Sequence, residues 1–133
     1  MTLYVDSSAL MKRYVREPDT ERANQLLASD PEVVTARHTM VEVRRNLARL
    51  LEPPAAATAR QDFAADLADI SLVELDEATC EVAAAIAEQT GVRALDALHL
   101  GAARRLGISI SFLTFDVRQA EAARSLGFRV LGS

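Results

Sequence analysis

Short apolar segments alternate with longer amphipathic segments along this chain. The apolar segments predict strands at residues 2–5, 33–35, 70–75, 108–115 and 128–131. The segments with helical spacing predict helices at residues 7–16, 20–29, 39–51, 55–69, 77–89, 94–106 and 117–126. Because the strands are apolar throughout rather than alternating, both of their faces should be covered. The pattern therefore predicts an α/β fold with a short parallel sheet wrapped by helices.

Two of the predicted helices carry a recognisable buried stripe. Helix 39–51 has an apolar stripe of Met40, Val43, Leu47 and Leu50. Helix 94–106 has one of Leu95, Leu98 and Ala102. Pro53 and Pro54 separate helix 39–51 from the next, and the two helices form an apolar hairpin. This hairpin is either ordinary core packing or one wall of a groove for a partner helix.

Length and composition indicate one globular domain in the cytoplasm. The chain has 133 residues, of which 50% are hydrophobic and 26% charged, as is typical of a soluble domain with its own core. No apolar run approaches the ~20 residues that span a bilayer, and the N-terminus does not read as a secretion signal. A single cysteine, Cys80, excludes an internal disulfide. We therefore expect one domain over residues 1–133 and no membrane segment.

The charge balance argues against a protein that binds nucleic acid constitutively. The formal net charge is −4 at pH 7, whereas such proteins usually carry basic patches. Fourteen of the 15 basic residues are arginine, which binds phosphate in a bidentate manner. A GC-rich genome explains that preference equally well. Aromatic residues make up only 5% and include no tryptophan, which argues against a base-stacking surface.

Two acidic residues directly follow predicted strands. Asp6 follows the strand at 2–5, and Asp116 follows the strand at 108–115. Ligands of parallel sheets bind beyond the carboxyl ends of the strands, so both side chains should lie at that edge. Each residue also has a purely structural interpretation. Asp6 is a possible N-cap of the next helix, and Asp116 with Gln119 makes a possible capping box.

Two further acids lie near the starts of predicted helices. Glu42 flanks the apolar stripe of its helix, and a surface ion pair with Arg45 is the alternative interpretation. Asp96 shares a helix face with His99. The alternative for Asp96 is a favourable position near a helix N-terminus, with His99 as its partner.

Taken together, the four acids indicate a cation site. In a parallel sheet, the strand ends and the starts of the following helices lie at the same end of the molecule. Carboxylates that converge there repel one another unless a cation neutralises them. Oxygen ligands without cysteine select Mg²⁺ or Mn²⁺ rather than zinc. Such an ion activates water for attack on a phosphodiester, and it explains how an acidic protein acts on a polyanion.

Four short motifs contain these acids: Asp-Ser-Ser-Ala-Leu at 6–10, Glu42, Leu-Asp-Ala-Leu-His at 95–99, and Thr-Phe-Asp at 114–116. Their order and spacing resemble the PIN-domain ribonucleases over nearly the whole chain, and most of all the VapC-type toxins of toxin–antitoxin pairs. The resemblance implies a three-layer α/β/α fold, dependence on Mg²⁺ or Mn²⁺ and endonucleolytic cleavage of RNA. It also implies a homodimer and a cognate VapB-like antitoxin that covers the site.

On this interpretation each acid has an expected role. Asp6 and Asp96 are the expected main metal ligands, directly or through water. Glu42 and Asp116 are expected to complete the acidic cluster and to hold any second ion. The expected reaction is attack of metal-activated water on phosphorus, without a covalent enzyme intermediate.

Three neighbouring residues are expected to support the acids. Thr114 lies two residues before Asp116, so in a strand both side chains point to the same face. The hydroxyl of Thr114 is expected to orient a carboxylate or a bound water, and Ser8 to do the same for Asp6. His99 is expected to be a structural partner rather than a base.

Arginines near the expected site are candidates for contacts with the RNA backbone. They are Arg93, Arg13, Arg16 and Arg37. For each of them, an ordinary solvated surface position is the alternative interpretation. With few aromatic residues available, recognition is expected to rest on shape and phosphate contacts.

Other functions remain as alternatives. A housekeeping PIN nuclease without an antitoxin would share the same fold and acids. A non-catalytic PIN-like scaffold that binds RNA or protein would share the fold, but usually lacks one or more of the acids. A phosphotransfer receiver domain needs a lysine after a late strand, and the only lysine is Lys12, in the first helix. A phosphatase of the haloacid-dehalogenase type needs an aspartate where this chain has Ser8.

Overall fold

The computed structural model describes residues 2–29 and 32–133, and their strands form one parallel sheet. The strands are β1 (Thr2–Val5), β2 (Glu32–Ala36), β3 (Ser71–Val73), β4 (Ser111–Leu113) and β5 (Arg129–Leu131). Their order is β3-β2-β1-β4-β5, and every neighbouring pair is parallel. This confirms the predicted parallel sheet, with β1 at its centre. All strands therefore end at the same edge.

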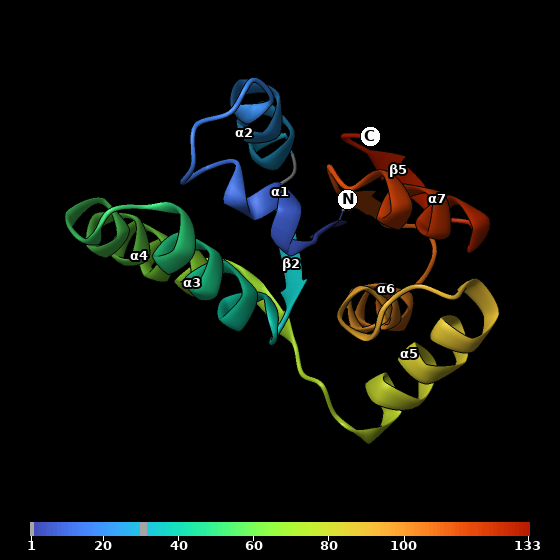
Figure 1. The fold of residues 1–133 in the computed structure, drawn as a ribbon. Coiled ribbons are helices and arrows are strands. Elements are labelled where there is room, and N and C mark those ends of the chain that lie inside the picture. Colours follow the sequence, from blue (N-terminus) through green and yellow to red (C-terminus); the bar gives the residue numbers. More distant parts are fainter. Residues whose placement is uncertain (1, 30–31) are drawn as a thin grey trace.

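Helices cover both faces of the sheet. They are α1 (Ser7–Met11), α2 (Thr20–Ala28), α3 (Thr39–Leu50), α4 (Pro53–Ala68), α5 (Glu77–Thr90), α6 (Ala94–Leu106) and α7 (Val117–Ser125). No helix in the described ranges is long and apolar enough to cross a membrane. Figure 1 shows α1–α4 on one side of the sheet and α5–α7 on the other.

Alternation along the central strand creates the two cores. Tyr4 packs into the core beneath α5, α6 and α7, whereas Leu3 and Val5 pack into the core beneath α1 to α4. Successive side chains of a strand point to opposite faces of its sheet, so each core receives residues from the same short strand. The result is the three-layer α/β/α arrangement, which confirms the predicted fold class.

Some elements are shorter than the sequence pattern predicts. Helix α1 ends at Met11 rather than at residue 16, because the N–H groups of Arg13 and Tyr14 bond to carbonyls three residues back. Their side chains also reach Asp66 of α4. Strand β4 covers three of the eight residues predicted at 108–115. Its neighbours β1 and β5 have only four and three residues to pair with it.

Two positions predicted to be buried are exposed. Leu50 is 49% exposed at the end of α3, and Leu95 is 51% exposed at the start of α6. Helix α6 instead buries the side that carries Leu100 and Gly101. A Cβ atom at Gly101 would lie 2.8 Å from the Cβ of Ala83 in α5. The missing side chain therefore lets α5 and α6 pack closely, and this contact rather than the leucine stripe sets which face of α6 is inside.

Candidate active site

Asp6 lies at the carboxyl edge of the sheet, directly after the central strand. Its side chain is 4% exposed. It accepts hydrogen bonds from Thr114 Oγ1 at 2.6 Å, Ser8 Oγ at 2.7 Å and the Ala9 N–H at 3.1 Å. The bond from Ala9 caps α1, which confirms the structural interpretation of Asp6. Burial raises the pKa of Asp6, and the neighbouring His99 together with the three hydrogen bonds offsets only part of that effect.

The hydroxyls of Thr114 and Ser8 connect Asp6 to the segment after β4. Thr114 Oγ1 donates to Asp6 Oδ2 and accepts the N–H of Asp116 at 3.1 Å. Ser8 Oγ donates to Asp6 Oδ1 and accepts the N–H of Phe115 at 3.1 Å. Two strand ends are thereby joined around one carboxylate. Orientation of a bound metal or water by these hydroxyls stays a prediction.

Asp116 caps α7, as its structural interpretation predicted. Its Oδ1 accepts the N–H groups of Arg118 at 2.9 Å and Gln119 at 3.2 Å. The predicted capping box is not completed, because the Asp116 N–H bonds to Thr114 instead of to the Gln119 side chain. Gln119 Nε2 donates to the backbone carbonyl of Asp96 at 3.1 Å. Gln119 therefore fastens α7 to the first turn of α6.

Glu42 lies in the first turn of α3 and faces inward. Its Oε1 accepts hydrogen bonds from Ser7 Oγ at 2.7 Å and His99 Nε2 at 2.8 Å. The alternative surface pair with Arg45 does not form, since the Arg45 guanidinium contacts Asn46. Burial raises the pKa of Glu42, but the interaction with His99 and the hydrogen bond from Ser7 outweigh burial, so the net pKa is lowered. Glu42 is therefore ionised at neutral pH.

His99 connects Glu42 to the buried Tyr4. Because a carboxylate only accepts, His99 Nε2 carries the proton that it donates to Glu42. Its Nδ1 then accepts from the Tyr4 hydroxyl at 2.8 Å. Burial raises the pKa of Tyr4 well above its ordinary value, which keeps that hydroxyl protonated. His99 thus hydrogen-bonds to Glu42 rather than to Asp96, the partner that helical spacing suggested.

Asp96 lies half-buried in the first turn of α6, and its pKa reports on the other acids. Burial raises the pKa of Asp96, and the negative charges of Asp116, Asp6 and Glu42 raise it further. The neighbouring His99 acts in the opposite direction. Hydrogen bonds through Thr114 join Asp6 to Asp116, and Gln119 joins α7 to Asp96, so these acids lie at one edge of the sheet. Glu42 acts on Asp96 from the first turn of α3. The structure thus brings together all four acids selected from the sequence. Their metal-binding and catalytic roles stay predictions.

Comparison with known proteins identifies the family of this chain. The family model described as PIN domain matches residues 3–125. This chain belongs to the PIN-domain family. It is 33% identical over 130 residues to Ribonuclease VapC46 of Mycobacterium tuberculosis. That alignment covers 97% of this chain and 95% of the relative. That identity places it among the VapC-type members and confirms the predicted resemblance.

Solved structures of other proteins support the same fold. FitAcB from Neisseria gonorrhoeae superposes with a TM-score of 0.77 at 21% identity, over 97% of this chain and 96% of that one. A toxin–antitoxin complex from Klebsiella pneumoniae superposes with a TM-score of 0.70 at 16% identity, over 90% of this chain and 89% of that one. At these identities the likeness establishes the PIN fold alone.

This PIN domain contains a second group of possible metal ligands beside the acids. Atoms of His38, Glu42 and His99 lie within 4.8 Å of one another. His38 Nε2 is 3.0 Å from the carbonyl oxygen of Leu95, which only accepts, so this nitrogen carries a proton. Both imidazoles therefore present N–H groups rather than lone pairs. Burial and the neighbouring His99 lower the pKa of His38 to about 4. The carboxylates are thus the better donors for a hard cation.

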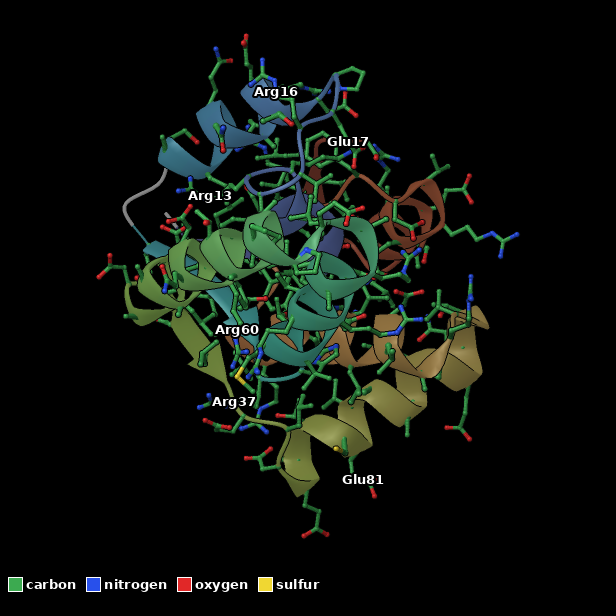
Figure 2. The ribbon with its side chains drawn as sticks, turned by 60° about the vertical axis from the view of Figure 1, so that its left-hand side comes forward. Arg13, Arg16, Glu17, Arg37, Arg60 and Glu81 are labelled. Atoms are coloured by element: carbon green, nitrogen blue, oxygen red, sulfur yellow. The ribbon has the colours of Figure 1, made fainter. Side chains whose placement is uncertain are left out.

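Three of the four arginines considered for RNA contacts are paired with acids. Their ion pairs are Arg13–Asp66 at 3.1 Å, Arg16–Glu21 at 3.0 Å and Arg37–Glu74 at 2.6 Å. Figure 2 shows Arg13 and Arg16 toward one end of the molecule and Arg37 toward the other, so these three do not form one patch. Arg93 is the one of the four whose guanidinium has no partner within residues 2–29 and 32–133.

Sequence reasoning misses the residues that hold Glu42. Ser7, Tyr4 and His38 receive no role from the sequence, although each lies within the network around Glu42 and His99. One usable signal exists: Tyr4 carries a hydroxyl in an otherwise apolar strand, and a buried tyrosine hydroxyl usually has a partner. No local spacing identifies that partner, because the residues meet only when β1, α3 and α6 pack together.

Proposed function

We propose that this PIN-domain protein is a metal-dependent endoribonuclease and the toxin of a VapBC-type toxin–antitoxin pair. One observation carries the proposal: Thr114 links Asp6 to the Asp116 backbone, Gln119 links α7 to the Asp96 backbone, and the charges of Asp116, Asp6 and Glu42 act on Asp96. Four carboxylates that repel one another in this way form a site that a divalent cation stabilises. The name of the 33% identical relative, a ribonuclease, supports RNA as the substrate.

Asp6 and Asp96 are the proposed main ligands of Mg²⁺ or Mn²⁺, with Glu42 and Asp116 completing the cluster. The donor chemistry fits these ions, since all four side chains offer carboxylate oxygens. Asp6 retains coordination capacity, because a carboxylate has about four acceptor positions and Asp6 accepts three hydrogen bonds. A bound ion would activate water and neutralise charge on the phosphodiester.

The chain's own contribution is to hold the carboxylates in place. Ser8 and Thr114 restrict the rotation of Asp6 by bonding to both of its oxygens. His99 donates to Glu42 and accepts from Tyr4, so both of its nitrogens are engaged. We therefore assign His99 as a positioning residue and not as the base of the reaction. Rigid placement of this kind lets the acids meet the cation without rearrangement.

The proposal extends to partners. We propose that the chain acts as a single domain over residues 1–133 in the cytoplasm, that it forms a homodimer, and that a VapB-like antitoxin binds it. A groove of about 600 Å³ between α3 and α4, with Met40, Leu47 and Ala56 among its lining, suits an apolar face of an antitoxin helix. The toxin–antitoxin complex from Klebsiella pneumoniae shares the fold. A housekeeping nuclease without an antitoxin is the alternative, which the neighbouring gene distinguishes. The four acids together disfavour a non-catalytic scaffold.

The test is RNA cleavage by the purified protein with Mg²⁺ or Mn²⁺, with and without EDTA. Asp6→Asn and Asp96→Asn should each reduce cleavage more than 100-fold, because each removes a metal ligand and its charge. Asp62→Asn is the matched control, since Asp62 is exposed on α4. In metal-free protein, Asp96→Asn should raise the free energy of unfolding by up to about 1 kcal/mol, because it relieves repulsion at a half-exposed site.

Three outcomes contradict this proposal. The first is cleavage that EDTA does not inhibit. The second is full activity of the Asp96→Asn protein. The third is equal loss of activity in Asp96→Asn and Asp62→Asn. Circular dichroism and thermal melting of each variant separate loss of chemistry from loss of the fold.

A further inference from the structure

A polar cleft of about 590 Å³ opens beside the acidic cluster. Its walls are the end of α5 with the following connection at residues 89–93, the first turn of α6, and α7. Asp96 lines the cleft, so the cleft and the acidic cluster share a carboxylate. The volume falls in the range of about 300–1,000 Å³ that is typical of pockets for small molecules, and a nucleotide belongs to that size class.

Two arginines, one before α6 and one in α7, line this cleft. Arg93 precedes α6, and Arg118 lies at the start of α7. Neither guanidinium has an ion-pair or hydrogen-bond partner in the part of the chain that the structure describes. They differ in this from Arg13, Arg16 and Arg37, which are paired with acids. An exposed, unpaired guanidinium is well suited to bind a phosphate through two N–H groups.

The two walls are held at a defined separation. Gln119, which is 1% exposed, donates its side-chain N–H to the carbonyl of Asp96 and so ties α7 to α6. The backbone N–H of Arg118 is fixed by Asp116 Oδ1 at 2.9 Å. The Arg118 side chain therefore begins beside Asp116, and Arg93 lies three residues before Asp96.

The charges lining the cleft explain which ligand fits. Arg93 and Arg118 are balanced by Asp96 and Glu121, so the protein alone offers no net positive charge there. A cation held by the acidic cluster makes the local charge positive. The cleft is thus best suited to a phosphate chain that also reaches the cation. No aromatic side chain lines it, which argues against base stacking and for contact with the backbone.

We propose that this cleft holds the sugar-phosphate unit next to the scissile phosphate of the RNA, with Arg93 and Arg118 binding its phosphate oxygens. The inference rests on the proposed RNA-cleaving function and deepens it. Arg93 and Arg118 are substrate-positioning residues in this scheme and take no part in bond breaking. RNA backbone, rather than a particular base, is what the cleft recognises.

The test uses a 5′-fluorescein single-stranded RNA of 12 random nucleotides. Its single-turnover cleavage with Mn²⁺ is measured against protein concentration. Its binding is measured by fluorescence anisotropy with Ca²⁺ in place of Mn²⁺. Arg93→Ala and Arg118→Ala should each raise the half-saturating protein concentration five- to tenfold, with the maximal rate within threefold of the parent. The slope of log Kd against log salt should fall by about 1 for each arginine removed. Arg129→Ala, at an exposed arginine of β5 outside the cleft, should leave both values within twofold.

The possible outcomes separate the cleft from the function. Unchanged affinity and salt slope in both cleft-arginine variants overturn the cleft proposal, as does an effect of Arg129→Ala of equal size. The cleft proposal is also overturned if the arginine variants keep their RNA affinity but no longer bind a co-expressed antitoxin. That result would show that the cleft binds a protein partner. If the parent protein cleaves no RNA with either metal, the proposed function fails, and the anisotropy data still decide whether the cleft binds RNA.

Discussion

Two halves of the acidic cluster are held by different chemistry. Asp6 receives its hydrogen bonds from two neutral hydroxyls and a backbone N–H, whereas Glu42 receives them from Ser7 and the imidazole of His99. Burial raises the pKa of Asp6, while the partners of Glu42 outweigh burial and lower its pKa. The direct hydrogen-bond donors thus differ: two hydroxyls and a backbone N–H for Asp6, and a hydroxyl and an imidazole for Glu42.

The two halves also differ in the sequence separation between each acid and its hydrogen-bond partners. For Asp6, the capping N–H and Ser8 are within three residues, and Thr114 follows β4, the strand that pairs with β1. For Glu42, the donors come from α1 and α6, and Tyr4 supports His99 from β1. The difference teaches that the Asp6 half depends on strand pairing, whereas the Glu42 half depends on the packing of helices against the sheet.

The largest expected effect is on the Glu42 half. His99→Leu should reduce the free energy of unfolding by about 3 kcal/mol, because it leaves the Tyr4 hydroxyl without its acceptor and Glu42 without a donor. Urea unfolding followed by circular dichroism measures this. His99→Gln is the control, since its amide can still donate to Glu42, and it should lose about half as much. A His99→Leu protein as stable as the parent would show that the network contributes nothing to the fold.

A smaller effect is expected on the Asp6 half. Thr114→Val should reduce the free energy of unfolding by about 2 kcal/mol, because it removes a donor to a buried carboxylate and an acceptor for the Asp116 N–H. It should also raise the Mn²⁺ concentration needed for half-maximal cleavage at least fivefold. Thr58→Val removes an exposed hydroxyl that bonds to the Pro54 carbonyl and should change stability by less than about 0.5 kcal/mol. Equal effects of the two valines would contradict a special role for Thr114.

Lowering the pH should affect the stability of the two halves in opposite directions. The pKa of His38 is about 4 in the folded protein against an ordinary 6.5, so the unfolded chain binds more protons between these values. His38 therefore contributes stability that is lost as the pH falls from about 6.5 toward 4. Glu42, whose pKa is also lowered, adds a loss below its ordinary 4.5. Asp6 and Asp96, whose pKa values are raised, instead relieve their repulsion on protonation.

His38→Gln tests this pH dependence in metal-free protein. Glutamine keeps an N–H donor for the Leu95 carbonyl but does not titrate. Between pH 7 and pH 5, the free energy of unfolding should fall by about 1–2 kcal/mol less in the variant than in the parent. Urea titrations at four pH values measure the difference. Parallel pH profiles for the two proteins would rule out His38 as the source.

Much of the fold is readable from the sequence because it depends on local periodicity. The five strands and seven helices follow from the alternation of short apolar and long amphipathic segments, and the apolar strands indicate a covered parallel sheet. Element ends are less readable: β4 is shorter than its apolar run, because pairing partners and not composition limit a strand. The exposure of Leu50 and Leu95 has a similar cause, since periodicity marks a helix face but not the neighbour that covers it.

By itself, the sequence determined the layered α/β fold and the four acids, because strand ends and helix starts of a parallel sheet converge at one edge whatever the details of packing. Only the tertiary structure decided what holds each acid. Three sets of contacts join residues that are far apart in the chain. They are the network of Glu42, His99 and Tyr4, the bond of Gln119 to the α6 backbone, and ion pairs such as Arg13–Asp66. Hydrogen bonds and ion pairs depend on distances of a few ångströms, which residue spacing along a chain does not specify.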